Sequence, residues 1–312
     1  MKVLITGGTG FQGSNLAKSL LDDGHQVRLL NLYSEKSKTN VEIFKLKEAE
    51  VVWGTINDIH TVEECVRDVD IIIHCAAKIH VDESIDEPAK FYLTNVMGTN
   101  NVLECARRHS IPFMHISTCE VYGYQAGVLK EDASLLPRSP YASSKAGADR
   151  MVYSYNTTYG MNNVILRPFN VYGIGQKDGK AGAVIPIWAT QVLKELPILI
   201  YGTGQQSREF IYIDDLVRAY RIIIDKMLST NELAGKVINI GTEEDITVND
   251  LAKLVVDTSE TDVKTIYGRP RPGEVKRFLS DSSYMRSLGW EPKVSMEEGM
   301  KKYINWRRER NK

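Results

Sequence analysis

A phenol and an ammonium group stand four residues apart in this chain, at Tyr141 and Lys145, within a segment (140–159) that predicts a long helix. Four residues make about one helical turn, so the two side chains share a face. A lysine charge lowers the pKa of a nearby phenol, and the phenol can then take a proton from a hydroxyl group. The pair therefore predicts a general base, provided that other reactive side chains lie around it.

Such side chains follow the apolar run at residues 113–117, which predicts a buried strand. Thr118, Cys119 and Glu120 come directly after this run. In a doubly wound sheet the carboxyl ends of the strands face the ligand. We therefore expect a hydroxyl, a thiol and a carboxylate near the phenol. The predicted catalytic residues are Thr118, Cys119, Glu120, Tyr141 and Lys145.

A glycine-rich turn lies near the first residue. Gly7, Gly10 and Gly13 are spaced by three residues and follow an apolar run at residues 3–5. Dinucleotide-binding turns use this spacing because the backbone must adopt positive φ and approach the pyrophosphate closely. The helix that follows offers N–H groups and the positive end of its dipole to the phosphates. The predicted cofactor contacts in this turn are Gly7, Gly10, Phe11, Gln12 and Gly13.

The residue expected to contact the adenosine ribose is Asn31, at the end of the second apolar run. An acidic residue is usual there because it bonds the ribose hydroxyl of NAD. An amide can also bond a hydroxyl, and it does not repel the 2′-phosphate of NADP, for which Lys36 and Lys38 lie nearby. We predict NAD and leave NADP open. Asp58 and Ile59, beyond the third apolar run, are placed to cover the adenine.

Apolar runs and helical patterns alternate through the first half of the chain. The predicted strands are residues 3–5, 27–30, 50–53, 69–74, 113–117 and 163–166, and the predicted helices are residues 14–23, 61–67, 95–109 and 140–159. Strands that are apolar on both faces are typical of a parallel sheet covered by helices. The pattern predicts an α/β fold, a Rossmann doubly wound parallel sheet with a smaller C-terminal substrate-binding lobe.

The alternation ends after residue 167, where prolines accumulate. Residues 237–240 have the pattern of a late strand that returns to the main sheet. We predict a cofactor-binding domain of residues 1–167 plus about 209–242, and a substrate-binding lobe of residues 168–208 plus about 243–312.

Composition gives no sign of a nucleic-acid, membrane or metal partner. The net charge is −1, and the four cysteines, Cys65, Cys75, Cys105 and Cys119, form no CxxC pair. Neither a zinc site nor a disulfide framework is therefore predicted. The first residues lack the apolar run of a signal peptide, and no window is apolar enough to span a membrane. We predict a cytoplasmic protein without a bound metal.

Several linked motifs resemble the extended short-chain dehydrogenase/reductases that act on nucleotide sugars, the NAD-dependent epimerase/dehydratase family. The resemblance extends from Thr6 to Pro292. Its motifs are the glycine turn at residues 6–13, residues 76–84, 94–99, 139–145, 166–173, 208–215 and 288–292. Because the motifs are linked along most of the chain, the resemblance is specific.

The resemblance implies hydride transfer at C4 of a sugar linked to a nucleotide diphosphate. It assigns Tyr141 to take the proton of the C4 hydroxyl and Thr118 to bond the C4 oxygen. It assigns Lys145 to tune Tyr141 and to hold the nicotinamide ribose. The further cofactor contacts that it implies are Ala76, Ala77, Lys78, Tyr141 and Lys145.

The resemblance also implies a set of substrate contacts. Ser84 is expected near the sugar ring and Asn170 near the diphosphate. Arg208 and Arg271 are expected to bind the pyrophosphate, which suits bidentate guanidinium–phosphate pairing. Recognition of the nucleobase is expected around Val184, with Ile185 and Tyr201.

The triplet Thr118-Cys119-Glu120 bears on the reaction that follows C4 oxidation. The dehydratases of this family usually carry Thr-Asp-Glu, with the aspartate as the acid for the C6 hydroxyl and the glutamate as the base for the C5 proton. Glu120 retains the base, whereas a thiol at Cys119 is a much weaker acid than a carboxylic acid. The proton then comes from Cys119, water or Tyr141. We predict a 4,6-dehydratase of an NDP-hexose or NDP-N-acetylhexosamine.

Other hypotheses stay open. A 4-epimerase of the UDP-glucose type needs no carboxylate after Thr118. Hexosamine 5,6-dehydratases resemble the Thr-Cys-Glu triplet, and uronic-acid decarboxylases also lack the aspartate, although residues 139–145 resemble the dehydratase version. A non-catalytic nucleotide-sensing protein is the remaining class, and such proteins typically lose the tyrosine or lysine that this chain keeps. The resemblance also implies a homodimer, formed through helices 95–109 and 140–159.

Overall fold

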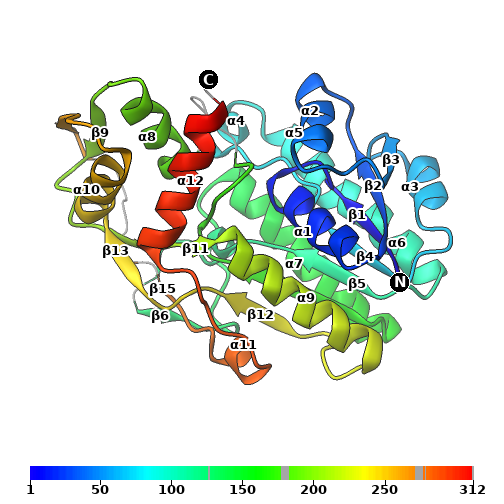
Figure 1. Cartoon of the computed structure of the whole chain (residues 1–312). Coiled ribbons are helices and arrows are strands. Elements are labelled where there is room, and N and C mark those ends of the chain that lie inside the picture. Colours follow the sequence, from blue (N-terminus) through cyan, green and yellow to red (C-terminus); the bar gives the residue numbers. More distant parts are fainter. Residues whose placement is uncertain (126, 177–182, 271–276, 278, 311–312) are drawn as a thin grey trace. The chain divides into compact units, whose positions relative to one another are not determined.

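The computed structural model describes residues 1–125, 127–176, 183–270, 277 and 279–310 (Figure 1). The contacts divide the chain into two compact units. Unit 1 consists of Met1–Gly123, Ser134–Pro168 and Val217–Ile238, and unit 2 consists of Tyr124–Ala133, Phe169–Leu216 and Asn239–Lys312.

Unit 1 is built on a seven-stranded sheet with the strand order β12-β7-β5-β4-β1-β2-β3. Its strands are β1 (Lys2–Thr6), β2 (Gln26–Asn31), β3 (Glu50–Trp53), β4 (Ile71–His74), β5 (Phe113–Ile116), β7 (Asn163–Pro168) and β12 (Val237–Ile240). From β3 to β7 neighbouring strands pair in parallel. The strand order reverses between β1 and β4, which is where such sheets bind ligands at the carboxyl ends of their strands.

Helices cover both faces of this sheet. The helices of unit 1 are α1 (Phe11–Asp22), α2 (Glu35–Ile43), α3 (Ile59–Cys65), α4 (Val81–Asp86), α5 (Pro88–Tyr92), α6 (Thr99–Arg108), α7 (Pro140–Tyr159) and most of α9 (Ile213–Ser229), with a π-helical turn η1 (Leu93–Gly98) and a 3-10 turn η2 (Cys119–Tyr122). On one face α3, α6 and α7 share an apolar core with Leu4, Ile72 and Ile165 of the sheet. On the other face α1 and α9 lie side by side (Figure 1). The Tyr220 hydroxyl donates to Gln12 Oε1 over 2.7 Å. Covered on both faces, the sheet confirms the predicted doubly wound fold.

The helices of unit 1 differ from the predictions: α2, α4, α5 and α9 were not predicted, and one predicted helix is divided. The single helix predicted for residues 95–109 is divided into the wider π-helical turn η1 and the α-helix α6. The turn widens where Asn95 reaches out to Lys78 and Ser144. Helix α2 was not predicted because it buries no residue and so has no apolar stripe. Its local stabilisation comes from Ser34, whose hydroxyl caps the helix by accepting from the Ser37 N–H at 3.0 Å.

Unit 2 contains short strand pairs and a group of helices. The pairs in its described residues are β10 (Ser207–Glu209) with β13 (Asp245–Thr247), β11 (Ile211–Tyr212) with β8 (Val171–Tyr172), β14 (Thr265–Gly268) with β9 (Ile198–Tyr201) and β15 (Leu279–Ser280) with β6 (Val128–Leu129). The helices are α8 (Val184–Leu193), α10 (Val248–Ser259), α11 (Ser283–Ser287) and α12 (Met296–Arg310). Helix α10 packs against both α8 and α12.

The compact units interleave along the chain more finely than the predicted domains. Residues 124–133 belong to unit 2, because β6 pairs with β15 and places Val128 opposite Leu279. Residues 209–216 and 239–242 also lie in unit 2. Two-residue strands that pair with a distant segment carry no periodicity that a sequence can reveal.

No helix within the described ranges is long and apolar enough to cross a lipid bilayer.

Candidate active site

The glycine turn between β1 and α1 has no room for side chains. Gly7 has a φ of +68°, and a Cβ atom there would lie 2.8 Å from the backbone of Ala76. A Cβ atom on Gly13 would lie 2.5 Å from the carbonyl oxygen of Gly7. Helix α1 begins after Gly10 with no side-chain cap, which leaves the first N–H groups of the helix to an external acceptor. The turn fits the pyrophosphate of a dinucleotide.

Asn31 holds this turn from the end of β2. Its Oδ1 accepts from the Thr9 N–H at 3.3 Å, and its Nδ2 donates to the Leu32 carbonyl at 3.0 Å and to Ser37 Oγ at 3.2 Å. Lys36 and Lys38 are exposed on α2. The position predicted to meet the adenosine ribose is therefore neutral and has lysines nearby.

Asp58 and Ile59, which were predicted to cover the adenine, lie at the start of α3. Asp58 caps α3, which begins at Ile59, and its carboxylate accepts from the Thr61 hydroxyl at 2.6 Å and from the His60 N–H at 3.0 Å. Both hydrogen bonds lower the pKa of Asp58, and the bond from the Thr61 hydroxyl has the larger effect.

The segment Ala76-Ala77-Lys78 follows β4. The Ala76 N–H donates to Thr6 Oγ1 at 3.3 Å. The Lys78 N–H and carbonyl bond the Asn95 side chain at 2.8 and 2.9 Å. The segment is thus fixed between the end of β1 and η1.

The predicted catalytic residues come together where β5 ends and α7 begins. Thr118 caps η2, and its Oγ1 accepts from the Glu120 N–H at 3.2 Å. Ser139 caps α7 by accepting from the Ala142 N–H at 3.0 Å, which places Tyr141 in the first turn of the helix.

Tyr141 is buried, and its neighbours include all three residues of the triplet. Burial raises the pKa of the phenol, the charge of Glu120 raises it further, and a hydrogen bond with Thr118 lowers it. Cys119 adds a smaller increase. Because such effects act over short distances, the hydroxyl, thiol and carboxylate of the triplet lie near the phenol. The net shift of the Tyr141 pKa is upward because of burial, whereas the sequence predicted that the charge of Lys145 would lower it.

Lys145 lies behind Tyr141 on the same helix and is 4% exposed. Its ammonium group donates to the Ile116 carbonyl over 2.7 Å. Burial lowers the pKa of Lys145 to about 8, and the nearby Asp149 carboxylate opposes that effect. Lys145 is therefore mostly charged at neutral pH and titrates within the range of an enzyme assay.

Sequence reasoning missed the ion pair between Asp149 and Arg167. Both side chains are buried, at 0% and 1% exposed. Arg167 donates from Nε and Nη2 to the two carboxylate oxygens, each at 2.9 Å. Burial opposes ionisation of Asp149, but the hydrogen bonds and charge of Arg167 hold its pKa below the ordinary value. Two features pointed to the pair: Asp149 lies one helical turn after Lys145, and Arg167 is a charge in an apolar strand.

A buried histidine, also not predicted, links three elements of unit 1. His74 Nδ1 lies 2.7 Å from Thr6 Oγ1, and His74 Nε2 lies 2.9 Å from Thr99 Oγ1. Burial lowers the pKa of His74 to about 3, so the ring is neutral. Since Thr6 also bonds Ala76, the histidine fixes the segment that follows β4.

The predicted substrate residues lie in both units. Ser84 in α4 is fully buried, and its hydroxyl donates to the Val81 carbonyl at 2.6 Å. In unit 2, Val184 is the half-buried first residue of α8. Arg271 lies outside the described residues.

Asn170 and Arg208 are grouped around Glu209 in unit 2. Asn170 Nδ2 donates to the Glu209 carbonyl at 2.7 Å, and Arg208 Nη1 donates to the Ser207 carbonyl at 2.7 Å. The Glu209 carboxylate accepts from the Ser280 N–H at 2.6 Å and from the Ser280 hydroxyl and Glu243 N–H, each at 2.8 Å. Burial raises the pKa of Glu209, and these donors oppose the rise.

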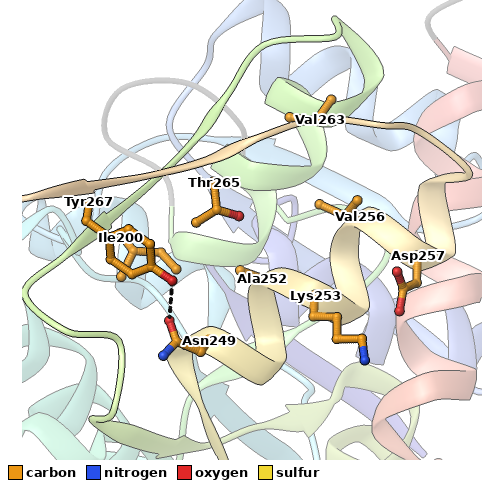
Figure 2. Close-up of a pocket in the computed structure, with 9 residues that line it drawn as sticks. All are labelled: Ile200, Asn249, Ala252, Lys253, Val256, Asp257, Val263, Thr265 and Tyr267. Carbon is orange, nitrogen blue, oxygen red and sulfur yellow. Dashed lines mark hydrogen bonds between the residues drawn. The ribbon is translucent and has the colours of Figure 1, made fainter.

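A surface pocket of about 300 Å³ lies in unit 2 between α10 and the β9–β14 pair (Figure 2). It is lined by apolar side chains that include Ile200 and Val256, and Tyr267 donates to Asn249 over 3.2 Å (Figure 2). None of the predicted catalytic or binding residues lines this pocket. Across the described part of the chain, no group of three or more side chains could hold a metal ion.

Sequence comparisons place these features in a known family. The family model described as GDP-mannose 4,6 dehydratase matches residues 4–303. A putative UDP-glucose 4-epimerase of Methanocaldococcus jannaschii is 32% identical over 99% of both chains. A dTDP-glucose 4,6-dehydratase of Streptomyces niveus is 33% identical over 99% of this chain and 93% of the relative.

Solved structures give the same two activities. The UDP-glucose 4-epimerase of Thermotoga maritima, solved with UDP-glucose, has a TM-score of 0.92 at 30% identity, with 100% of both chains covered. DesIV, a dTDP-glucose 4,6-dehydratase of Streptomyces venezuelae solved with NAD and TYD, has a TM-score of 0.90 at 32% identity, with 99% of this chain and 97% of that chain covered. The chain belongs to the NAD-dependent epimerase/dehydratase family of extended short-chain dehydrogenase/reductases.

Proposed function

We propose that this protein is an NAD-dependent 4,6-dehydratase of an NDP-hexose or NDP-N-acetylhexosamine. The observation that carries the proposal is Glu120, a carboxylate placed by η2 close to the phenol of Tyr141. An epimerase oxidises and re-reduces C4, for which one acid/base residue is enough. Loss of water across C5 and C6 needs a second base, and Glu120 supplies it.

Each catalytic residue has one task in this proposal. Tyr141 takes the proton of the C4 hydroxyl, Thr118 bonds the C4 oxygen, and the charge of Lys145 stabilises the phenolate. Bound NAD would supply the hydride acceptor for oxidation at C4 and the hydride donor for reduction at C6. The new C4 ketone makes the C5 proton acidic. Glu120 removes this proton as the C6 hydroxyl leaves with a proton from Cys119, water or Tyr141, and Glu120 returns a proton to C5 when C6 is reduced.

The two units divide the binding tasks. In this proposal unit 1 binds NAD through the glycine turn, Asn31, Asp58, Ile59 and residues 76–78. Unit 2 binds the nucleotide diphosphate through Asn170, Arg208, Arg271 and Val184, and Ser84 of unit 1 serves the sugar. The homodimer and the cytoplasmic location stay predictions.

The substitution Glu120→Gln tests the proposal because it keeps the shape of the side chain and removes the base. We expect C4 oxidation to persist, seen as a reduced-nicotinamide absorbance band after substrate is mixed with the enzyme. We expect the rate of water loss to fall by about 100-fold or more. A matched control is Glu63→Gln, which changes a half-buried carboxylate of α3 far along the chain from the triplet. Water release by Glu120→Gln at the wild-type rate would contradict the proposal.

A second candidate function is a nucleotide-sugar 4-epimerase. Cys119 favours it, because a thiol replaces the carboxylic acid that protonates the C6 hydroxyl in the usual dehydratases. The similarity to the two UDP-glucose 4-epimerases also supports it. Interconversion of the C4 isomers of one nucleotide sugar, with no loss of water, would establish this function.

A further inference from the structure

We propose that Asp149 is a positioning residue that fixes the triplet Thr118-Cys119-Glu120 against Tyr141 and Lys145. The inference rests on the proposed function only in taking these five residues to be catalytic. It applies to C4 oxidation, which a dehydratase and an epimerase share.

Asp149 is connected to both ends of the segment formed by residues 117–122, which contains the triplet. Ser117, directly before the triplet, donates its hydroxyl to Asp149 Oδ2 at 2.8 Å. Tyr122, at the other end, accepts at its hydroxyl from Arg167 Nη1 at 2.8 Å, and the guanidinium lies 4.8 Å from the centre of the Tyr122 ring. Arg167 in turn pairs with both oxygens of Asp149. One carboxylate therefore anchors the start of the turn directly and its end through Arg167.

Asp149 belongs to the same helix as the phenol and the ammonium group. Tyr141, Lys145 and Asp149 follow one another at intervals of four residues in α7. Residues at this interval share one face of a helix. Anchoring η2 to Asp149 thus sets the distance between the triplet and the Tyr–Lys pair through a rigid element.

The Asp149 carboxylate is buried and pairs with the buried Arg167 and with the exposed Arg150. Apolar residues of similar volume often replace a buried ion pair without loss of stability. Apolar residues could not, however, bond the Ser117 and Tyr122 hydroxyls. The ion pair is explained by the Ser117 and Tyr122 hydroxyls, which Asp149 and Arg167 bond.

The same carboxylate acts on Lys145. The titratable groups that act on the ammonium are Cys75, His74, His115 and Asp149, and the Ile116 carbonyl is its acceptor. Burial keeps both histidines neutral, and it raises the pKa of Cys75 to about 12, so that thiol is neutral as well. Burial also raises the pKa of Tyr141. Asp149 is then the anion that keeps Lys145 protonated at neutral pH.

The test uses four variants of the full-length protein. Asp149→Asn removes the charge, and Asp149→Glu restores it. Tyr122→Phe removes the hydroxyl that Arg167 bonds at the far end of η2, while the Asp149 charge stays. Glu63→Gln is the control, since Glu63 is paired with His109 and touches none of these residues. The readout is the rate of nicotinamide reduction by a nucleotide sugar that the wild type oxidises, measured across pH.

We expect Asp149→Asn to lower kcat for C4 oxidation by about 100-fold with the KM for the sugar nucleotide unchanged. Lys145 acts in its charged form, so activity is lost as pH rises through its pKa. Removal of the anion lowers that pKa, and the alkaline limb of the pH profile should move to lower pH. Asp149→Glu should return the limb toward its original position. Tyr122→Phe should lower kcat and leave the limb in place.

Two outcomes would overturn the proposal. One is that Asp149→Asn only lowers the melting temperature, with kcat and the pH profile unchanged. The other, decisive if Asp149→Asn does not fold, is a Tyr122→Phe enzyme with the kcat of the Glu63→Gln control. A wild type that reduces its nicotinamide but releases no water would contradict the dehydratase proposal alone, because C4 oxidation would still report on Asp149.

Discussion

Asp149 in unit 1 and Glu209 in unit 2 are both fully buried carboxylates, and they are compensated in different ways. Asp149 faces the guanidinium groups of Arg167 and Arg150, and its pKa is lowered. Glu209 faces N–H and O–H donors of Ser280 and Glu243, and its pKa is raised. A charge partner overcomes the cost of burial, whereas neutral donors only reduce it.

The difference matches what each carboxylate organises. Asp149 supports residues that move protons, so a fixed charge beside Lys145 is useful there. Glu209 joins β10, which carries Arg208, to β15 and to the residues after β12. Hydrogen-bond donors are enough for that joining role. The two sites therefore predict different functional losses on substitution and opposite dependences of the stability loss on pH.

The largest expected effect is in unit 1. Tyr141→Phe removes the proposed base, and we expect C4 oxidation to slow by about 1,000-fold. Binding of UDP or dTDP, which the proposal assigns to unit 2, should be unchanged by calorimetry. The control is Tyr159→Phe, which alters an exposed tyrosine at the end of the same helix. Equal loss of oxidation and of nucleotide binding would break the division between the units.

The second effect is in unit 2. Glu209→Gln places an NH2 group against N–H donors, which should cost about 2 kcal/mol of stability. Because Asn170 bonds the Glu209 backbone and Arg208 precedes it, nucleotide affinity should also fall, by about tenfold. Denaturant unfolding and calorimetry measure the two losses, with exposed Glu297→Gln as the control. Unchanged affinity together with lower stability would limit Glu209 to a structural role.

The third effect is the pH dependence of these stability losses. The lowered pKa of Asp149 contributes stability above the ordinary aspartate value of 3.8, and that stability is lost as pH falls through the folded pKa. The deficit of Asp149→Asn should therefore shrink toward acid pH. The raised pKa of Glu209 has the opposite sign, since the wild type loses stability as pH rises from 4.5 toward the folded pKa. The deficit of Glu209→Gln should shrink as pH rises, and unfolding curves that show the same trend for both variants would refute the comparison.

The smallest expected effect is at Asn31, an amide at a position where NAD-binding folds usually have a carboxylate. Asn31→Asp introduces a negative charge at the end of β2, where it would repel a 2′-phosphate. We expect the ratio of NAD to NADP affinity to rise by about tenfold. Fluorescence titration of both cofactors measures the ratio, and an unchanged ratio would mean that residue 31 does not meet the ribose.

The sequence predicted the parts of the molecule that depend on local patterns. The glycine spacing indicated the turn after β1, the apolar runs indicated the strands, and the interval between Tyr141 and Lys145 placed them on one helix face. Contacts between distant segments were not predictable in this way. Asp149 meets Arg167 across a helix and a strand, and β6 meets β15 through two residues. Helix α2 was not predicted because it has no buried face and therefore no apolar stripe.

The most direct test of the account is mass spectrometry of the products formed from a panel of UDP-, GDP-, dTDP- and CDP-sugars. We expect the wild type to remove one water molecule from one of these substrates, and we expect Glu120→Gln not to do so. Conversion of a substrate into an isomer of unchanged mass would contradict the dehydratase proposal. It would make the protein a 4-epimerase and leave Glu120 as a binding residue.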